Sequence, residues 1–126
     1  MARVRVTEGA RITLAVIRII NGALGLVAPR LLIGRIDPDE PASPAAVYAF
    51  RLFGIRTVLI GRDLLVRKGS ALRRSLDEAP MVHGSDTVTA TLLTVNGQVS
   101  RRAGIMLVAI SATNTVLALL ARRRRD

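Results

Sequence analysis

The chain has 126 residues, of which half are hydrophobic and 22% are charged, and its formal net charge is +10. Its length allows one domain at most, and the absence of cysteine excludes disulfides, cysteine-based metal sites and thiol chemistry. A composition that is rich in both apolar and charged residues predicts that the two kinds are segregated along the chain.

Four charge-poor segments follow one another along the chain, over residues 12–28, 46–66, 79–99 and 103–121. Each is close to the roughly 20 residues with which a helix crosses a hydrocarbon core of about 30 Å. The last segment contains no charged residue, so it lacks the charged outer face that a helix of a soluble four-helix bundle needs. The sequence therefore predicts an all-α fold, a four-transmembrane-helix bundle, in which residues 1–126 form a single integral membrane domain.

The first segment has a second interpretation, a cleaved signal peptide, because a basic start precedes an apolar run. Arg18 interrupts that run, and no A-x-A site closes it. We therefore expect the first segment to be retained as a helix.

Lys and Arg are distributed unevenly over the ends of these segments. With four spans, eleven share the side of the N-terminus: Arg3, Arg5, Arg11, Arg67, Lys68, Arg73, Arg74 and Arg122 to Arg125. The other side has four: Arg30, Arg35, Arg101 and Arg102. The positive-inside rule then predicts a multi-pass protein of the cell membrane with both termini in the cytoplasm.

The basic residues that flank the second, third and fourth segments also predict partners. We expect anionic lipid headgroups to contact Arg67, Lys68, Arg73, Arg74 and Arg122 to Arg125. Nucleic acid is not expected, because its binders gather basic residues on one face and add aromatic rings for stacking, whereas only 2% of this chain is aromatic.

Charged residues inside the segments predict a polar interior. An arginine at the bilayer centre costs about 2.5 to 3.5 kcal/mol on insertion scales, so such residues are expected to point toward other helices. Polar and small residues recur at helical spacing in the first, third and fourth segments, which predicts that these faces meet. The predicted buried polar cluster is Arg18, Arg51, Arg56, His83, Asp86 and Asn114. The predicted helix-packing glycines are Gly22, Gly25, Gly54 and Gly61.

This cluster has two interpretations. It is either a buried ion pair that holds the bundle together, or a functional site, namely a basic pocket for an anion or a proton path through Arg56, His83 and Asp86. Three arginines against the single carboxylate of Asp86 leave positive charge in excess, and a lipid phosphate, a carboxylate of a partner or an anionic ligand would balance it.

Short motifs in the middle of the chain also carry a resemblance. Pro29 in "ALGLVAPR", the run "RLFGIR" from Arg51 to Arg56, and Asp86 in "VHGSD" match a pattern found in a group of small, uncharacterised four-helix integral membrane proteins of actinobacteria. The chain resembles that group over roughly residues 15 to 104, and it departs from the pattern at His83, where the group has a first aspartate. The resemblance implies a four-helix membrane protein and implies no chemistry.

Signatures of enzymes are absent from the sequence. It has no G-x-S-x-G elbow and no Gly-rich phosphate loop, and His83 with Asp86 supplies two ligands where a metal needs more. Asp37, Asp39 and Glu40 form an acidic, proline-rich turn of the kind that is usually solvated. No enzyme activity, cofactor or metal is expected.

The expected function is that of a structural or accessory subunit that packs through polar and glycine-bearing helix faces in a membrane complex or a homo-oligomer. The alternative is a small transporter, or a membrane protein that binds an anion or an anionic lipid through the Arg/Asp cluster.

Overall fold

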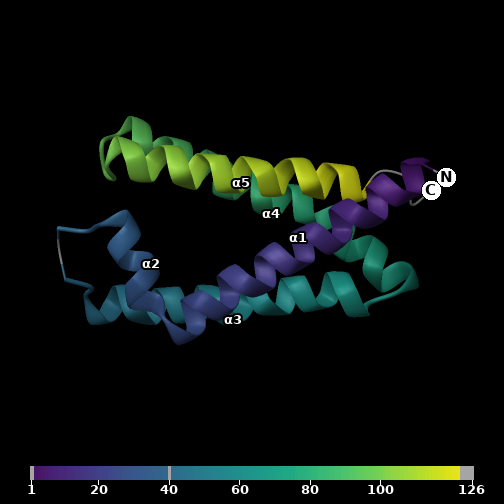
Figure 1. Ribbon diagram of the computed structural model, residues 1–126, viewed down its shortest axis with the longest axis horizontal. Coiled ribbons are helices and arrows are strands. Elements are labelled where there is room, and N and C mark those ends of the chain that lie inside the picture. Colours follow the sequence, from purple (N-terminus) through teal and green to yellow (C-terminus); the bar gives the residue numbers. More distant parts are fainter. Residues whose placement is uncertain (1, 40, 123–126) are drawn as a thin grey trace.

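The protein is all-helical in the residues that its computed structural model describes, which are 2–39 and 41–122 (Figure 1). Four long helices and one short helix follow one another: α1 (Ala2–Val27), α2 (Pro29–Ile36), α3 (Pro44–Val66), α4 (Gly69–Val95) and α5 (Arg101–Arg122). The long helices alternate in direction along the chain, so the N-terminus, the α3–α4 turn and the end of α5 lie at one end of the bundle. We call this end of the bundle the terminal end. The predicted all-α fold is confirmed.

Local sequence signals set the ends of the helices. Pro29 and Pro44 occupy the first turns of α2 and α3, where a missing N–H leaves no hydrogen bond unmade. Ser43 caps α3, because its hydroxyl accepts a hydrogen bond from the N–H of Ala46 at 3.1 Å. Gly69 and Gly97 have φ values of +60° and +70°, which side chains with a Cβ rarely adopt, and they allow the sharp turns before and after α4.

The helices extend beyond the predicted charge-poor segments. Helix α1 begins at Ala2 rather than at residue 12, and α4 begins at Gly69 rather than at residue 79, although α4 ends at Val95, short of residue 99. The reason is that Arg, Lys and Glu are good helix formers, so the charged stretches continue the helices instead of interrupting them. Absence of charge marks the part of a helix that suits a bilayer, not where the helix ends.

Three helices are long and apolar enough to cross a membrane, and they indicate a membrane protein. These stretches are Val4–Val27 in α1, Pro44–Val66 in α3 and Arg101–Arg122 in α5. Helix α4 does not reach the same apolarity, because Arg73, Arg74, Asp77 and Glu78 lie in its first half and Asp86 in its second half. The helical architecture therefore matches the prediction, and the fourth apolar span is not confirmed.

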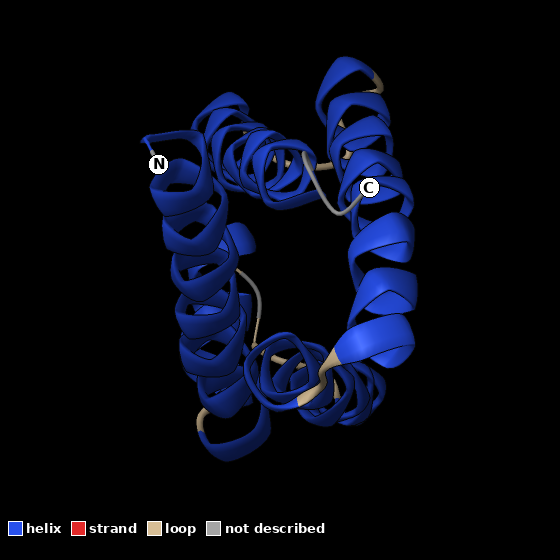
Figure 2. Cartoon of the chain, turned by 90° about the vertical axis from the view of Figure 1, so that its right-hand side faces the viewer, coloured by secondary structure: helices blue, strands red, loops and turns tan. Residues whose placement is uncertain are grey.

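The long helices form two closely packed pairs, and the two pairs contact each other less extensively. Helix α1 packs most extensively on α3, and α4 packs on α5. The two pairs meet mainly through α1 and α5, whereas α3 and α4 barely touch although only two residues separate them in sequence. Viewed along the bundle, the helices stand around its axis (Figure 2).

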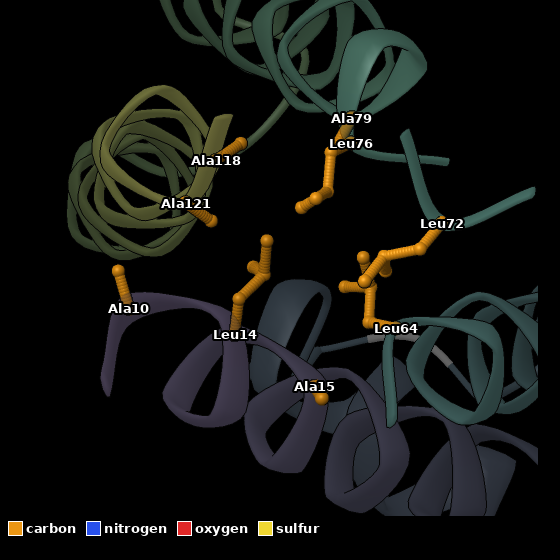
Figure 3. Packing of buried hydrophobic residues seen from close by; sticks show 9 residues of the cluster. All are labelled: Ala10, Leu14, Ala15, Leu64, Leu72, Leu76, Ala79, Ala118 and Ala121. Carbon is orange, nitrogen blue, oxygen red and sulfur yellow. The ribbon is translucent and has the colours of Figure 1, made fainter. Parts of the chain in front are cut away.

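A small apolar core joins the four long helices near the terminal end (Figure 3). Leu14 of α1, Leu64 of α3 and Leu76 of α4 are fully buried. Alanines such as Ala118 of α5 complete the cluster, and their small side chains let the helices approach. The part of the bundle farther from the termini therefore depends on other contacts, which involve glycine and polar side chains.

Candidate functional site

The four predicted packing glycines all lie where α1 meets α3. A Cβ added to Gly54 would lie 2.5 Å from the N of Leu26 and 2.6 Å from the O of Gly22. A Cβ on Gly22 would lie 2.7 Å from the O of Gly54, and one on Gly61 would lie 2.7 Å from the O of Ala15. Backbone meets backbone at these positions, so no side chain fits. We call this interface the glycine seam; it is formed by Gly22, Gly25, Gly54 and Gly61.

Arg18 is buried beside the glycine seam. Only 5% of the residue is exposed, its Nη2 donates to the hydroxyl of Thr57 at 3.4 Å, and its guanidinium lies 5.8 Å from the centre of the Phe53 ring. Its Nε has no hydrogen-bond partner among the described residues. Asp86 attracts the charge of Arg18 and Arg56 repels it, so three of the predicted cluster residues interact electrostatically. One hydrogen bond and one aromatic face therefore leave the Nε of this buried cation unsatisfied.

His83 and Asp86 follow one another on α4 with different exposure. His83 is fully buried, whereas 43% of the Asp86 side chain is exposed, and the Nδ1 of His83 lies 3.9 Å from the Oδ2 of Asp86. That distance is too long for a hydrogen bond, and neither ring nitrogen of His83 has a hydrogen-bond partner in the described part of the chain. His83 is therefore a buried polar ring that the protein itself does not satisfy.

The contact between α4 and α5 is polar at the depth of Asp86. Asn114 is buried, and its Oδ1 has no partner in residues 2–39 and 41–122. The hydroxyls of Thr87 and Thr115 lie 3.2 Å apart across the two helices, and each also donates to a carbonyl one turn earlier in its own helix. The predicted polar stripes on these helices do face one another.

Arg51 and Arg56 are exposed, which corrects their placement in the buried cluster. The buried side of α3 carries Gly54 and Gly61, and Arg56 lies two residues past Gly54, about 200° around the helix. Arg51 lies about 140° from Arg56 on another side. The structure gives neither arginine a hydrogen bond or an ion pair within the residues it describes. The predicted cluster is thus divided, with Arg18, His83 and Asn114 inside, Asp86 partly exposed, and these two arginines outside.

Arg56 lies on the side of α3 that faces α4. It precedes Ile60, Asp63 and Arg67 by 4, 7 and 11 residues, so these residues share one side of the helix. On the same side, at the terminal end of α3, Arg67 donates to the hydroxyl of Ser75 on α4 at 3.3 Å.

Since α3 and α4 are antiparallel, residues equally far from this contact lie at the same level. Arg56 and Asp86 are both eleven residues away from it, on α3 and α4 respectively. They therefore lie at the same level on the two helices, yet no ion pair joins them in the described chain.

A pocket of about 200 Å³ lies between α3 and α4. Helix α3 contributes Ile60, Asp63, Leu64 and Arg67, and α4 contributes Ser75, Glu78, Ala79, Val82 and His83. The lining thus contains two carboxylates, those of Asp63 and Glu78, and one guanidinium, that of Arg67, although the chain as a whole is strongly basic. The sequence did not reveal this pocket, because its existence depends on how far α3 and α4 diverge.

Some of the basic residues of the terminal end form ion pairs with carboxylates of the chain. Arg67 pairs with Asp63 at 3.2 Å, and Arg122 pairs with Asp77 at 3.0 Å. Lys68, Arg73 and Arg74 are exposed, and their contact with lipid headgroups stays a prediction. Arg123 to Arg125, which belong to the same prediction, lie outside the described residues.

No group of three His, Asp or Glu side chains in residues 2–39 and 41–122 could hold a metal ion. Of the acidic turn, Asp37 and Asp39 are exposed, and Glu40 lies outside the described residues.

Three residues matter here that the sequence analysis did not single out. Thr57 and Phe53 are the contacts of Arg18, and Gly104 packs against the side chain of Thr94. A signal existed for Thr57, which is three residues after Gly54 and four before Gly61 and therefore shares their side of α3.

Comparison of the chain with protein-family models, with curated proteins and with solved structures finds no match.

Proposed function

We propose that the protein crosses a membrane four times, with α4 as the third crossing. Helices α3 and α5 run in the same direction (Figure 1). If both cross the bilayer, the chain must return between them, and α4 is the element that runs back. Its 27 residues give a helix of about 40 Å, longer than the about 30 Å that a crossing needs.

The polarity of α4 is compatible with such a crossing. Its charged residues from Arg73 to Glu78 lie at the terminal end, and Asp86 is the only Asp, Glu, Lys or Arg after them in α4. The hydroxyls of Thr87, Thr89, Thr91 and Thr94 each donate to a carbonyl of the preceding turn at 2.8–2.9 Å. A threonine that is bonded in this way presents mainly its methyl group, so α4 is less polar toward lipid than its composition indicates.

The terminal end faces the cytoplasm in this proposal. With four crossings, the sequence assigns eleven Lys and Arg to the side of the N-terminus and four to the other side, and the positive-inside rule assigns the richer side to the cytoplasm.

Within the membrane, the protein acts as a structural or accessory subunit that packs through the outward side of α3. The observation that supports this role is the exposure of Arg51 within an apolar helix, with no hydrogen bond or ion pair in the described chain. It lies four residues from the middle of α3, about 6 Å along the axis, among the exposed side chains of Tyr48, Leu52 and Ile55. A guanidinium at this depth needs an acceptor, and a neighbouring subunit or a second copy supplies it.

The glycines do not serve this contact. Gly22, Gly25, Gly54 and Gly61 are occupied within the chain, between α1 and α3. The partner-binding surface is therefore the apolar, arginine-bearing side of α3 and not a glycine face.

A second candidate function is the binding of an anion or an anionic lipid, with or without transport. It is favoured by Arg18, which is buried with an unpartnered Nε in the described chain. It is also favoured by the charge balance, because the two positive charges of Arg18 and Arg56 exceed the single negative charge of Asp86. Here the ligand would enter from the side of α3 that carries Arg56.

Native mass spectrometry of the detergent-extracted protein separates the two candidates. Packing through α3 predicts a complex of fixed stoichiometry that Arg51→Leu dissociates. Arg62→Leu is the matched control, because it lies eleven residues along on the same side of α3 and near its end, where it meets Asp63 at 3.3 Å. Anion binding predicts instead a retained anionic lipid that Arg56→Leu releases. A bare monomer in all variants would contradict both candidates.

A further inference from the structure

Beyond the packing role, we propose that the pocket between α3 and α4 is a binding site for a small primary amine in its ammonium form. The proposal rests on the contents of the pocket: an excess of carboxylates, an imidazole without a partner, and an apolar wall.

His83 defines one requirement of the ligand. It lines the pocket, it is fully buried, and neither of its ring nitrogens has a hydrogen-bond partner among the described residues. Of the two neutral tautomers, the one that carries its proton on Nδ1 directs that proton toward the carboxylate of Asp86, whose Oδ2 lies 3.9 Å away. The other nitrogen, Nε2, is then an acceptor without a donor, so a ligand that satisfies His83 must donate a hydrogen bond.

The charges of the pocket define a second requirement. Asp63 is already paired with Arg62 and Arg67, and Arg67 also donates to Ser75. Glu78 has no hydrogen bond or ion pair in the part of the chain that the structure describes. The lining therefore has one uncompensated negative charge, which excludes an anion and favours a cation. A metal is disfavoured, because the described residues contain no group of three suitable ligands.

A primary ammonium meets both requirements. It has three N–H donors and no acceptor, so it can donate to Glu78, to Asp63 and to the imidazole together. Ile60, Leu64 and Val82 form an apolar wall for a short hydrocarbon body. The volume of about 200 Å³ is below that of drug-sized sites, which limits the ligand to a small molecule or a headgroup.

Two sources supply this chemistry, a free amine from the aqueous phase and the ethanolamine headgroup of a lipid. The pocket opens near the terminal end, where Arg67 and Glu78 are exposed, so both have access.

The single histidine of the chain makes the test direct. Protein with ¹⁵N-labelled histidine is placed in phosphatidylcholine nanodiscs, and n-butylammonium is titrated while the imidazole signals of His83 are followed by NMR at constant pH. A saturable shift is expected. Butyrate, which matches the ligand in size and differs in charge, and tetramethylammonium, which has no N–H, are expected to leave the signals in place. If the lipid headgroup is the source, nanodiscs with phosphatidylethanolamine show the shifted signals before any amine is added.

Variants locate the site. Glu78→Gln is expected to weaken binding about threefold to fivefold, since an exposed charge pair contributes up to about 1 kcal/mol. Asp77→Asn, the neighbouring carboxylate outside the pocket, is expected to have no effect. Val82→Phe fills the pocket and is expected to abolish binding. The proposal is overturned if neither amine source moves the His83 signals, if butyrate moves them as much, or if Asp77→Asn weakens binding as much as Glu78→Gln.

Discussion

Helix α3 takes part in two interfaces of opposite character. Toward α1 it presents Gly54 and Gly61, and the two backbones touch with no space for one methyl group. Toward α4 it presents Arg56, Ile60 and Asp63, and the helices diverge enough to leave a pocket of about 200 Å³.

The difference shows how a small bundle separates stability from function. Without a hydrophobic driving force between helices in lipid, association depends on close van der Waals packing, and the glycine seam provides it. The α3–α4 interface contributes little packing, and it contains His83, whose ring nitrogens have no hydrogen-bond partner among the described residues. We expect substitutions in the first interface to change stability and substitutions in the second to change binding.

The largest effect is expected at the centre of the glycine seam. Gly54→Ala places a Cβ 2.5 Å from the N of Leu26, so the helices must separate, and the free energy of unfolding should fall by about 1 to 3 kcal/mol. The measurement is reversible unfolding in mixed micelles. Gly84→Ala on α4 is the matched control, because nothing lies within 4 Å of its added Cβ. It should be neutral or stabilise the protein by up to about 1 kcal/mol. Equal effects at both glycines would refute the distinction between the interfaces.

A smaller effect is expected at Thr57, next to the seam. Thr57→Val removes the hydroxyl that accepts from Arg18 and leaves a buried cation with one contact fewer, which should lower the free energy of unfolding by about 1 kcal/mol. The comparison variant is Thr89→Val, where the lost hydrogen bond is to the carbonyl of Ser85 on an exposed side of α4. A change of no more than about 0.5 kcal/mol is expected there. If both variants lower the free energy of unfolding by the same amount, the hydroxyl of Thr57 does not stabilise the buried Arg18.

The smallest effect on stability is expected in the α3–α4 interface. Val82→Phe enlarges a half-buried side chain that lines the pocket, and the free space should accept the ring with a change below about 1 kcal/mol. The same unfolding titration measures it. A loss as large as that of Gly54→Ala would show that α3 and α4 pack more tightly than the structure indicates.

The sequence predicted the contents of the glycine seam better than those of the α3–α4 interface, for a physical reason. A glycine in an apolar helix has one main use, close approach, so Gly22, Gly25, Gly54 and Gly61 were identified from residue type and spacing alone. An arginine in such a helix only indicates that an acceptor is needed. It does not say whether the acceptor lies inside the chain or outside it, which is why Arg51 and Arg56 were misplaced.

The helix boundaries and the pocket illustrate two further limits. The charge-poor run over residues 12–28 located the end of the apolar stretch of α1, which runs over Val4–Val27, but it could not show that the helix begins at Ala2, since charged residues also favour helices. The divergence of α3 and α4 follows from how two helix pairs lean on one another. No local sequence pattern encodes the distance between α3 and α4.

The glycine seam also restricts motion. Sliding α1 along α3 by one turn, about 5.4 Å, would bring larger side chains against Gly54 and Gly61, where not even a methyl group fits. The two helices can therefore shift only together, as one rigid unit, relative to α4 and α5. Any rearrangement that brings Arg18 closer to Asp86 would then carry Arg56 and one wall of the pocket with it.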